Sequence, residues 1–284
     1  NDAINNVGVG YQSLSALIQG DDNTAVGYRS LLDLEDGDYN VGIGSSAGRS
    51  ITDGENNVAI GYQSLDANLT GDLNVAIGTS ALGAFIGNAS VAIGREALRD
   101  LNHADANGTI GIGTGAGASL TSGIGNVAIG YQSLDAEDDG DYSTAVGYQA
   151  LTTQTGTTGT VANVAVGYQA GYGLTSATGV TAIGYKAGGN ATMTGGVNTL
   201  VGSLAGQSIT DGEENTIVGS DAGDAITTGD KNTAVGRSAL GALIGGSSNT
   251  AIGTASADAM TDGASNVAIG QDALGSSTSV ANSV

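Results

Sequence analysis

Hydrophobic and polar residues alternate in short, closely similar stretches along the whole chain. The stretch "NNVAIGYQSL" at 56–65 returns as "GNVAIGYQSL" at 125–134, and near-copies stand at 23–32 and 265–274. Eleven of the fifteen spacings between the glycines that close these stretches are 17 residues, and the others are 16, 18, 19 and 20. A fixed period of this size indicates a repeat architecture, so residues 1–284 are expected to form a single array. The sixteen anchor glycines are Gly10, Gly27, Gly44, Gly61, Gly78, Gly94, Gly113, Gly130, Gly147, Gly167, Gly184, Gly202, Gly219, Gly236, Gly253 and Gly270.

Two β-branched residues precede every anchor glycine, with a small residue between them. The first β-branched row, three residues before the anchor, is Val, Thr or Ile in all sixteen repeats, and the second, directly before it, is Val or Ile. The residue between them forms the small row, which is Ala or Gly except at Leu200 and Ile217. Because residues two apart share one face of a strand, this pattern predicts a short strand with a β-branched face and a nearly flat face.

Glycine-rich turns separate these strands. A second glycine follows the anchor by ten residues in many repeats, within acidic stretches such as "DGDYN" and "DGENN" where a positive φ is easily adopted. A turn every eight or nine residues excludes helices and indicates coils that stack, each strand pairing with its copies in the adjacent coils. The sequence therefore predicts an all-β, parallel β-solenoid of about sixteen 17-residue coils. At a strand spacing of about 4.8 Å it would be on the order of 75 Å long.

The sequence leaves open which face of the strand points into the coil. If the small row points inward, the β-branched rows form an apolar stripe that needs a partner, and a homotrimer is the closed arrangement that we expect. If the β-branched rows point inward, the chain could stand alone. The residues assigned to this trimer or core stripe are Ile43, Ile60, Ile77, Ile129, Val146, Ile252 and Ile269.

The amino-acid composition limits the classes of partner that this chain can bind. The 284 residues include 50 Gly and no Pro, Cys or Trp, so disulfides contribute nothing and an aromatic core is excluded. Seven Lys and Arg against 28 Asp and Glu give a net charge of −21, which argues against nucleic acid and anionic membranes as partners. No apolar run has the length of a membrane-spanning segment.

The repeated string Asn-Val-Ala-Ile-Gly, with two further residues before Ser or Ala and then Leu or Ala, resembles the head repeats of trimeric autotransporter adhesins. Similar repeats occur in phage and bacterial tail-fibre proteins. The resemblance implies a trimeric, left-handed parallel β-roll outside a cell or on a virion. We therefore expect a non-enzymatic fibrous protein, the shaft or head segment of a tail fibre or bacterial surface adhesin that supports attachment. The string is carried by residues 57–65, 126–134, 163–170, 232–240 and 266–274.

Tyrosines directly follow many anchor glycines, so in a solenoid they line up along one edge. Outward rings could contact glycans or a host surface, or they could simply stack on one another as a structural ladder. This possible surface-binding ladder comprises Tyr11, Tyr28, Tyr62, Tyr131, Tyr148, Tyr168 and Tyr185.

Other chemistry has weaker sequence support. The acidic turns at 33–40 and 135–143 gather carboxylates, as calcium loops do, but match neither the EF-hand spacing nor the nonapeptide of calcium-binding β-rolls. We expect solvated turns and no cofactor, with calcium as the alternative. His103, the only histidine, lies in an insertion without acid–base partners and is expected in an exposed loop. The stretch "GIGTGAG" at 111–117 lacks the lysine of a phosphate loop, so it is interpreted as a local copy of the repeat.

Two rival functions remain. Thr199, Thr216, Thr233 and Thr250 form a threonine row at solenoid spacing, which suggests an ice-binding β-solenoid. The chain begins at Asn1 and ends at Val284, three residues short of the next expected anchor. We expect the array to continue within a longer fibre; the alternative is end-to-end assembly of separate molecules into an extracellular filament.

Overall fold

The computed structural model describes residues 3–155 and 159–283. Val284, the last residue of the sequence, lies outside the described residues. The chain divides into two compact units, Asn1–Tyr142 and Ser143–Val284, and both carry the same repeat.

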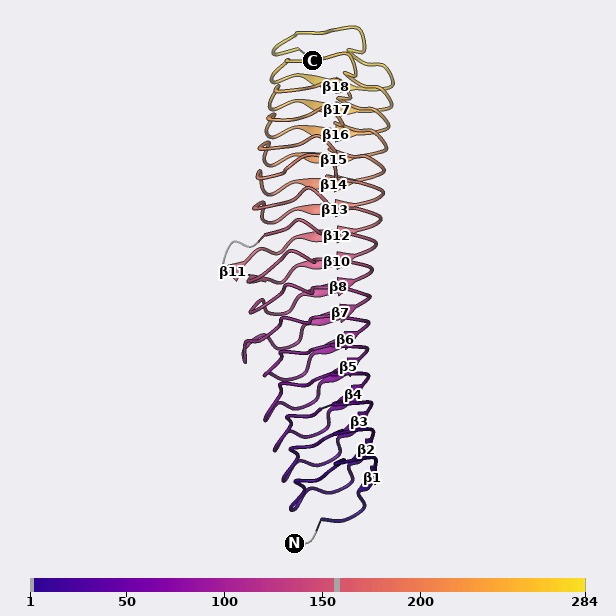
Figure 1. Cartoon of the computed structure of the whole chain (residues 1–284). Helices are drawn as coiled ribbons and strands as arrows, with labels where there is room; N and C mark the ends of the chain where they lie inside the picture. The colour runs from indigo at the N-terminus through magenta and orange to yellow at the C-terminus, as the bar shows by residue number, and fades with distance from the viewer. Residues whose placement is uncertain (1–2, 156–158, 284) are drawn as a thin grey trace. The chain divides into compact units, whose positions relative to one another are not determined.

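The first unit is a parallel sheet of eight three-residue strands that pair in chain order (Figure 1). The register joins equivalent repeat positions, so that Val58 pairs with Val75 and Ile60 with Ile77. A two-residue strand, β9 (Gly140–Asp141), ends the unit. The eight strands are β1 (Val7–Val9), β2 (Thr24–Val26), β3 (Val41–Ile43), β4 (Val58–Ile60), β5 (Val75–Ile77), β6 (Val91–Ile93), β7 (Ile110–Ile112) and β8 (Val127–Ile129).

The second unit repeats this architecture, and Thr199 there pairs with Thr216 in the same register. A two-residue strand, β11 (Gly159–Thr160), lies outside the main sheet. The main strands are β10 (Thr144–Val146), β12 (Val164–Val166), β13 (Thr181–Ile183), β14 (Thr199–Val201), β15 (Thr216–Val218), β16 (Thr233–Val235), β17 (Thr250–Ile252) and β18 (Val267–Ile269).

The predicted all-β parallel β-solenoid is confirmed. Its sixteen three-residue strands enclose about fifteen complete coils, one fewer than the number of repeats, because a coil closes only where the next strand begins. Within the described part of the chain, no helical segment has the length and apolar character that crossing a bilayer requires.

The anchor glycines end the strands in a conformation that no other residue adopts readily. Their φ values lie between 123° and 142°. A Cβ built on Gly44 would stand 2.6 Å from the carbonyl oxygen of Gly61 in the next coil. Backbone conformation and close backbone approach both demand glycine here, which explains why the anchor recurs in every repeat.

The corner after each anchor uses left-handed residues that are not glycine. In the coil that follows β4, Gln63 has φ 52° and Leu65 has φ 49°. Single left-handed residues cost free energy in isolation. Here Gln63 N–H donates to the Ser45 carbonyl at 3.1 Å and Leu65 N–H to the Ala81 carbonyl at 3.0 Å, so bonds between coils hold the corner.

Burial decides the orientation of the strands. The small row is buried in every coil from β2 to β18, as Ala59 and Ala76 illustrate, whereas the β-branched residues on either side are partly or fully exposed. The small row therefore faces the inside of the coil. The alternative orientation, with β-branched residues in the core, is wrong.

Leucines four residues after the anchor fill much of the interior. Beside some of the glycines that stand at that position, Leu200 or Ile217 of the small row fills the space instead. A Cβ on Gly188 would stand 2.8 Å from Leu200 Cδ1, and one on Gly206 would stand 2.6 Å from Leu200 Cδ2. Leu200 thus occupies space that leucine side chains fill elsewhere. Ile217 does the same beside Gly223, where a Cβ would stand 3.0 Å from Ile217 Cδ1. The buried leucines are Leu31, Leu65, Leu82, Leu98, Leu134, Leu151 and Leu240.

A buried asparagine row, four residues before the anchor, links successive coils. Asn57 Nδ2 donates to the Gly71 carbonyl at 2.8 Å, while its Oδ1 accepts from Asn74 N–H at 3.0 Å. The same arrangement recurs in the second unit, where Asn215 Nδ2 donates to Gly229 and Asn215 Oδ1 accepts from Asn232 N–H. These bonds satisfy backbone groups that would otherwise be buried without partners. The structural role of this row was not predicted from the sequence.

Candidate functional site

The two β-branched rows form the outer stripe, an apolar face on the outside of the coils in each unit. Residues at the ends of the chain are the most exposed, with Val9 at 57% and Ile269 at 68%. Ile43 and Ile252 are each 40% exposed. The remaining stripe residues assigned from the sequence, Ile60, Ile77, Ile129 and Val146, are half-buried. None of the seven lies in the core of its own coil, so these residues are available to a partner.

The outer stripe changes character between the units. In the second unit, the first β-branched row presents five successive threonines in register, each beside a Val or Ile of the second row. Parallel strands repeat at about 4.8 Å, and residues two apart along a strand lie about 6.6 Å from each other. The result is a regular array of hydroxyl and methyl groups. The threonines are Thr181, Thr199, Thr216, Thr233 and Thr250.

The tyrosines that follow the anchors are exposed, with between 44% and 65% of each ring residue accessible. Within the first unit, Tyr11 stacks on Tyr28 with ring centroids 5.6 Å apart. Within the second, Tyr168 stacks between Tyr148 and Tyr185 at 5.2 and 5.4 Å. The stacking supports the structural interpretation for these rings. Tyr62 and Tyr131 occupy the same repeat position.

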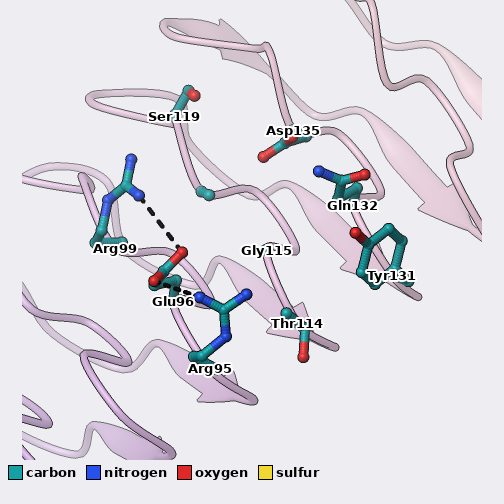
Figure 2. A pocket seen from close by; sticks show the side chains of 10 residues that line it. Arg95, Glu96, Arg99, Thr114, Gly115, Ser119, Tyr131, Gln132 and Asp135 are labelled. Atoms are coloured by element: carbon teal, nitrogen blue, oxygen red, sulfur yellow. Dashed lines mark hydrogen bonds and ion pairs between the residues drawn. The ribbon is translucent and has the colours of Figure 1, made fainter.

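A cavity of about 270 Å³, the Gly115 notch, opens on the first unit where one coil lacks large outward side chains. Figure 2 shows Arg95, Glu96 and Arg99 on one side of this hollow and Tyr131, Gln132 and Asp135 on the other. These triplets occupy identical positions one, two and five residues after their anchors. The coil between them carries Thr114, Gly115 and Ala118 at those positions, which leaves the space empty.

Paired charges line the Gly115 notch. Arg95 donates to Glu96 at 2.6 Å, Arg99 lies 3.6 Å from the same carboxylate, and Arg99 also pairs with Asp100 at 2.5 Å. Burial raises the pKa of Asp135 above its ordinary value, although Arg99 acts in the opposite direction. The hydrogen bond to Asp100 raises the pKa of Arg99, so this guanidinium stays charged. The notch therefore offers hydrogen-bond donors and acceptors held in fixed pairs.

This notch was not predicted from the sequence. The available signal was Gly115 at a position that is Gln in five other repeats, with Arg95 in the preceding repeat where Tyr is common. A related hollow of about 270 Å³ lies beside Gly83, lined in part by Asp66 and Arg99. Small residues at corner positions thus create hollows on the surface of the coil.

The acidic turn at 135–143 brings Glu137, Asp138 and Asp139 together, with carboxylate oxygens within 4.8 Å of one another. The buried Glu137 carboxylate accepts from the backbone N–H of Gly140 at 2.9 Å. In the other acidic turn, the Asp38 carboxylate accepts from Asp21 N–H at 2.7 Å. These contacts give the carboxylates a structural role in the turns, and calcium binding stays an untested hypothesis.

The remaining sequence candidates lie on the surface or in the repeat itself. The His103 side chain is half-exposed in its loop, and its Nδ1 lies 3.9 Å from the Asp105 carboxylate. The stretch at 111–117 contains the end of β7 and the anchor Gly113, as expected for a local copy of the repeat.

Comparison with models of protein families and with curated proteins gave no match for this chain.

Proposed function

We propose that this chain is a non-enzymatic structural segment of an extracellular fibre, a tail fibre or a bacterial surface adhesin, and that three copies associate through the outer stripe. The supporting observation is the outward orientation of both β-branched rows. An apolar stripe that runs along successive coils is unusual on a solitary soluble protein and commonly marks an interaction surface. A second copy of this chain offers a stripe with the same spacing, and closed symmetry about one axis buries the outer stripe of every copy equally.

Charge fits this arrangement. The chain carries a net charge of −21, so close approach of copies is opposed everywhere except on a face without charged residues. The two β-branched rows contain only Val, Ile and Thr. Acidic turns would then face solvent and keep the assembly soluble.

Light scattering after size-exclusion chromatography tests the proposal. The unmodified chain should elute as three copies at micromolar concentration. Ile60→Asp combined with Ile77→Asp should give a folded monomer, because a charge placed in an apolar interface without a counterion is strongly unfavourable.

Leu69→Asp combined with Leu73→Asp is the matched control. Leu69 is 52% exposed and Leu73 is 60% exposed, and both lie outside the outer stripe, so this double substitution adds the same two charges without touching the proposed interface. It should leave three copies assembled. An unmodified chain that is monomeric at micromolar concentration would overturn the proposal.

Ice binding is a second candidate function, and the five in-register threonines of the second unit favour it. Their hydroxyl and methyl groups repeat in register from strand to strand, which is the regularity that an ice-binding face needs. This function requires the array to face solvent, whereas the trimer covers it, so the two proposals exclude each other for that face.

A thermal-hysteresis measurement separates them. If the threonine row binds ice, the unmodified chain depresses freezing and Thr216→Leu weakens the effect. If the outer stripe is a trimer interface, no hysteresis appears.

A further inference from the structure

The Gly115 notch has the features of a built binding site. Large polar side chains face one another across a coil whose corner is reduced to Thr114, Gly115 and Ala118 (Figure 2). Three successive coils at a spacing of about 4.8 Å place these walls about 10 Å apart. The volume of about 270 Å³ is slightly below the range of roughly 300–1000 Å³ typical of small-molecule pockets. Such a space suits a single small ring.

The lining combines hydrogen-bonding groups of every kind with one aromatic ring. Arg95 and Arg99 donate, Glu96 and Asp135 accept, and Thr114 does both. The Tyr131 ring stands at one side and is 45% exposed. Vicinal hydroxyl groups match paired donors and acceptors, and the C–H face of a sugar ring can pack on an aromatic ring.

We propose that the Gly115 notch binds one ring of a neutral carbohydrate. A carbohydrate site would give the proposed fibre a ligand of defined class, so this proposal rests on the proposed function. A terminal sugar of a surface polysaccharide and a free saccharide would present the same ring to the notch.

Charge on the notch disfavours ionic ligands. The two guanidinium groups are already paired with carboxylates, Arg95 with Glu96 and Arg99 with Asp100. Asp135 adds a further carboxylate, so an anion would meet repulsion. A cation would meet the two arginines. A neutral polyhydroxyl ring can bond to these pairs without separating them, because its hydroxyls both donate and accept.

Filling the notch tests the inference without disturbing the fold. A Cβ on Gly115 would stand 3.4 Å from Gln132 Cγ, which is an ordinary contact, and the φ of Gly115 is 67°. The same position holds Gln with φ between 49° and 56° in other coils, so Gly115→Gln restores a residue that this corner accepts. Ala255→Gln makes the corresponding change in the second unit, where φ is 53°, and serves as the matched control.

Binding is measured by saturation-transfer NMR and calorimetry with cellobiose, lactose and chitobiose, and with inorganic phosphate and calcium chloride as ionic probes. We expect at least one disaccharide to bind, Gly115→Gln to abolish binding, and Ala255→Gln to leave it unchanged. Tyr131→Ala should weaken binding by about tenfold, which corresponds to the loss of one aromatic contact. Retention on immobilised polysaccharide distinguishes a terminal surface sugar from a free saccharide as the source of the ring.

The inference is overturned if no disaccharide binds, if Gly115→Gln binds as well as the unmodified chain, or if phosphate or calcium displaces the sugar. Light scattering on the same samples keeps the two proposals separate. A trimer that binds no sugar overturns the carbohydrate site alone, and a monomer that binds sugar overturns the trimer alone.

Discussion

The first β-branched row is almost entirely aliphatic in the unit Asn1–Tyr142, where Thr24 is its one threonine, and mostly threonine in the unit Ser143–Val284. The backbone register is the same in both, because each strand pairs with the next at equivalent positions. The interiors also differ. Leu65 fills its coil in the first unit, whereas Leu200 and Ile217 of the small row fill coils of the second.

This difference separates what the fold requires from what it tolerates. Both units keep the anchor glycines, where the backbones of neighbouring coils approach closely. Both also keep most of the asparagine row, whose side chains bond to the backbone of neighbouring coils. Interior volume is conserved by exchanging large residues between positions, as expected for close-packed cores. The outward rows vary, so selection on the surface can act on each unit separately.

Substitution of an anchor glycine should have the largest effect on the free energy of unfolding, and the effect should be equal in both units. In Gly61→Ala the new Cβ would stand 2.7 Å from the Gly78 carbonyl oxygen, and in Gly219→Ala it would stand 2.5 Å from that of Gly236. We expect each change to lower the free energy of unfolding by about 3 kcal/mol or more, measured by denaturant titration. Gly115→Ala, with no contact under 3.4 Å, should cost no more than about 1 kcal/mol. Similar losses at all three positions would contradict the backbone explanation.

The asparagine row should come next. Asn57→Ala and Asn215→Ala each leave a buried carbonyl and a buried N–H without partners, so we expect losses of about 2 to 4 kcal/mol in thermal or denaturant unfolding. Asn190→Ala removes an exposed amide that bonds to Gln207 and should cost less than about 0.5 kcal/mol. If Asn190 and Asn215 prove equivalent, the buried bonds do not stabilise the stack as described.

Exchanging the rows sharpens the contrast between the units. Val58→Thr with Val75→Thr should weaken self-association, since isosteric hydroxyls replace methyl groups on the outer stripe. Thr216→Val with Thr233→Val should strengthen it. We expect shifts of roughly tenfold in the dissociation constant in opposite directions, followed by sedimentation equilibrium. Shifts in the same direction would show that apolar character does not drive association.

The smallest effect concerns pH. Burial raises the pKa of Asp135 and of Asp224 above the ordinary value of 3.8. The folded chain then binds these protons more tightly than the unfolded chain, so stability falls as pH rises above 3.8 and stays lower once the folded pKa is passed. Asp135→Asn and Asp224→Asn should therefore stabilise the chain at pH 7 and have no such benefit below pH 3.8.

Neighbouring groups act in both directions at each site. Arg99 lowers and Glu96 raises the pKa of Asp135, whereas Asp221 raises the pKa of Asp224 and the backbone N–H groups of Asp224 and Ala225 lower it. Burial is the largest cause at both sites, so both variants should gain stability, which thermal melting across a pH series measures. A variant that is no more stable than the unmodified chain at pH 7 would contradict a raised pKa at that site.

The period and the β-branched pattern were enough to predict the fold class, because residues such as Val58 and Ile60 recur at fixed distances from a glycine. They could not decide the strand orientation, since both faces are apolar and only packing inside the coil distinguishes Ala59 from its neighbours. The exceptional Leu200 is explained by the space beside Gly188 that its side chain fills, and only the packed coils show this space. Interior volume is shared between coils, and no single repeat reveals it.

The asparagine row and the Gly115 notch were not predicted for different reasons. Asn stands four residues before the anchor in twelve of sixteen repeats, so the signal was present, but a polar residue beside a turn is usually solvated. The notch depends on three coils at once. Arg95, Gly115 and Asp135 are far apart in the sequence, and only stacking brings their positions into line.

The order of strand pairing, in which each strand bonds to the next one along the chain, also determines how these units respond to force. A pull on the two ends of a unit would detach terminal coils one after another, since an interior coil is held on both sides. Each coil of 17 residues would release about 55 to 60 Å of extended chain. A unit built in this way is an extensible tether with many yield points of similar strength, and it would dissipate mechanical load gradually instead of failing at once.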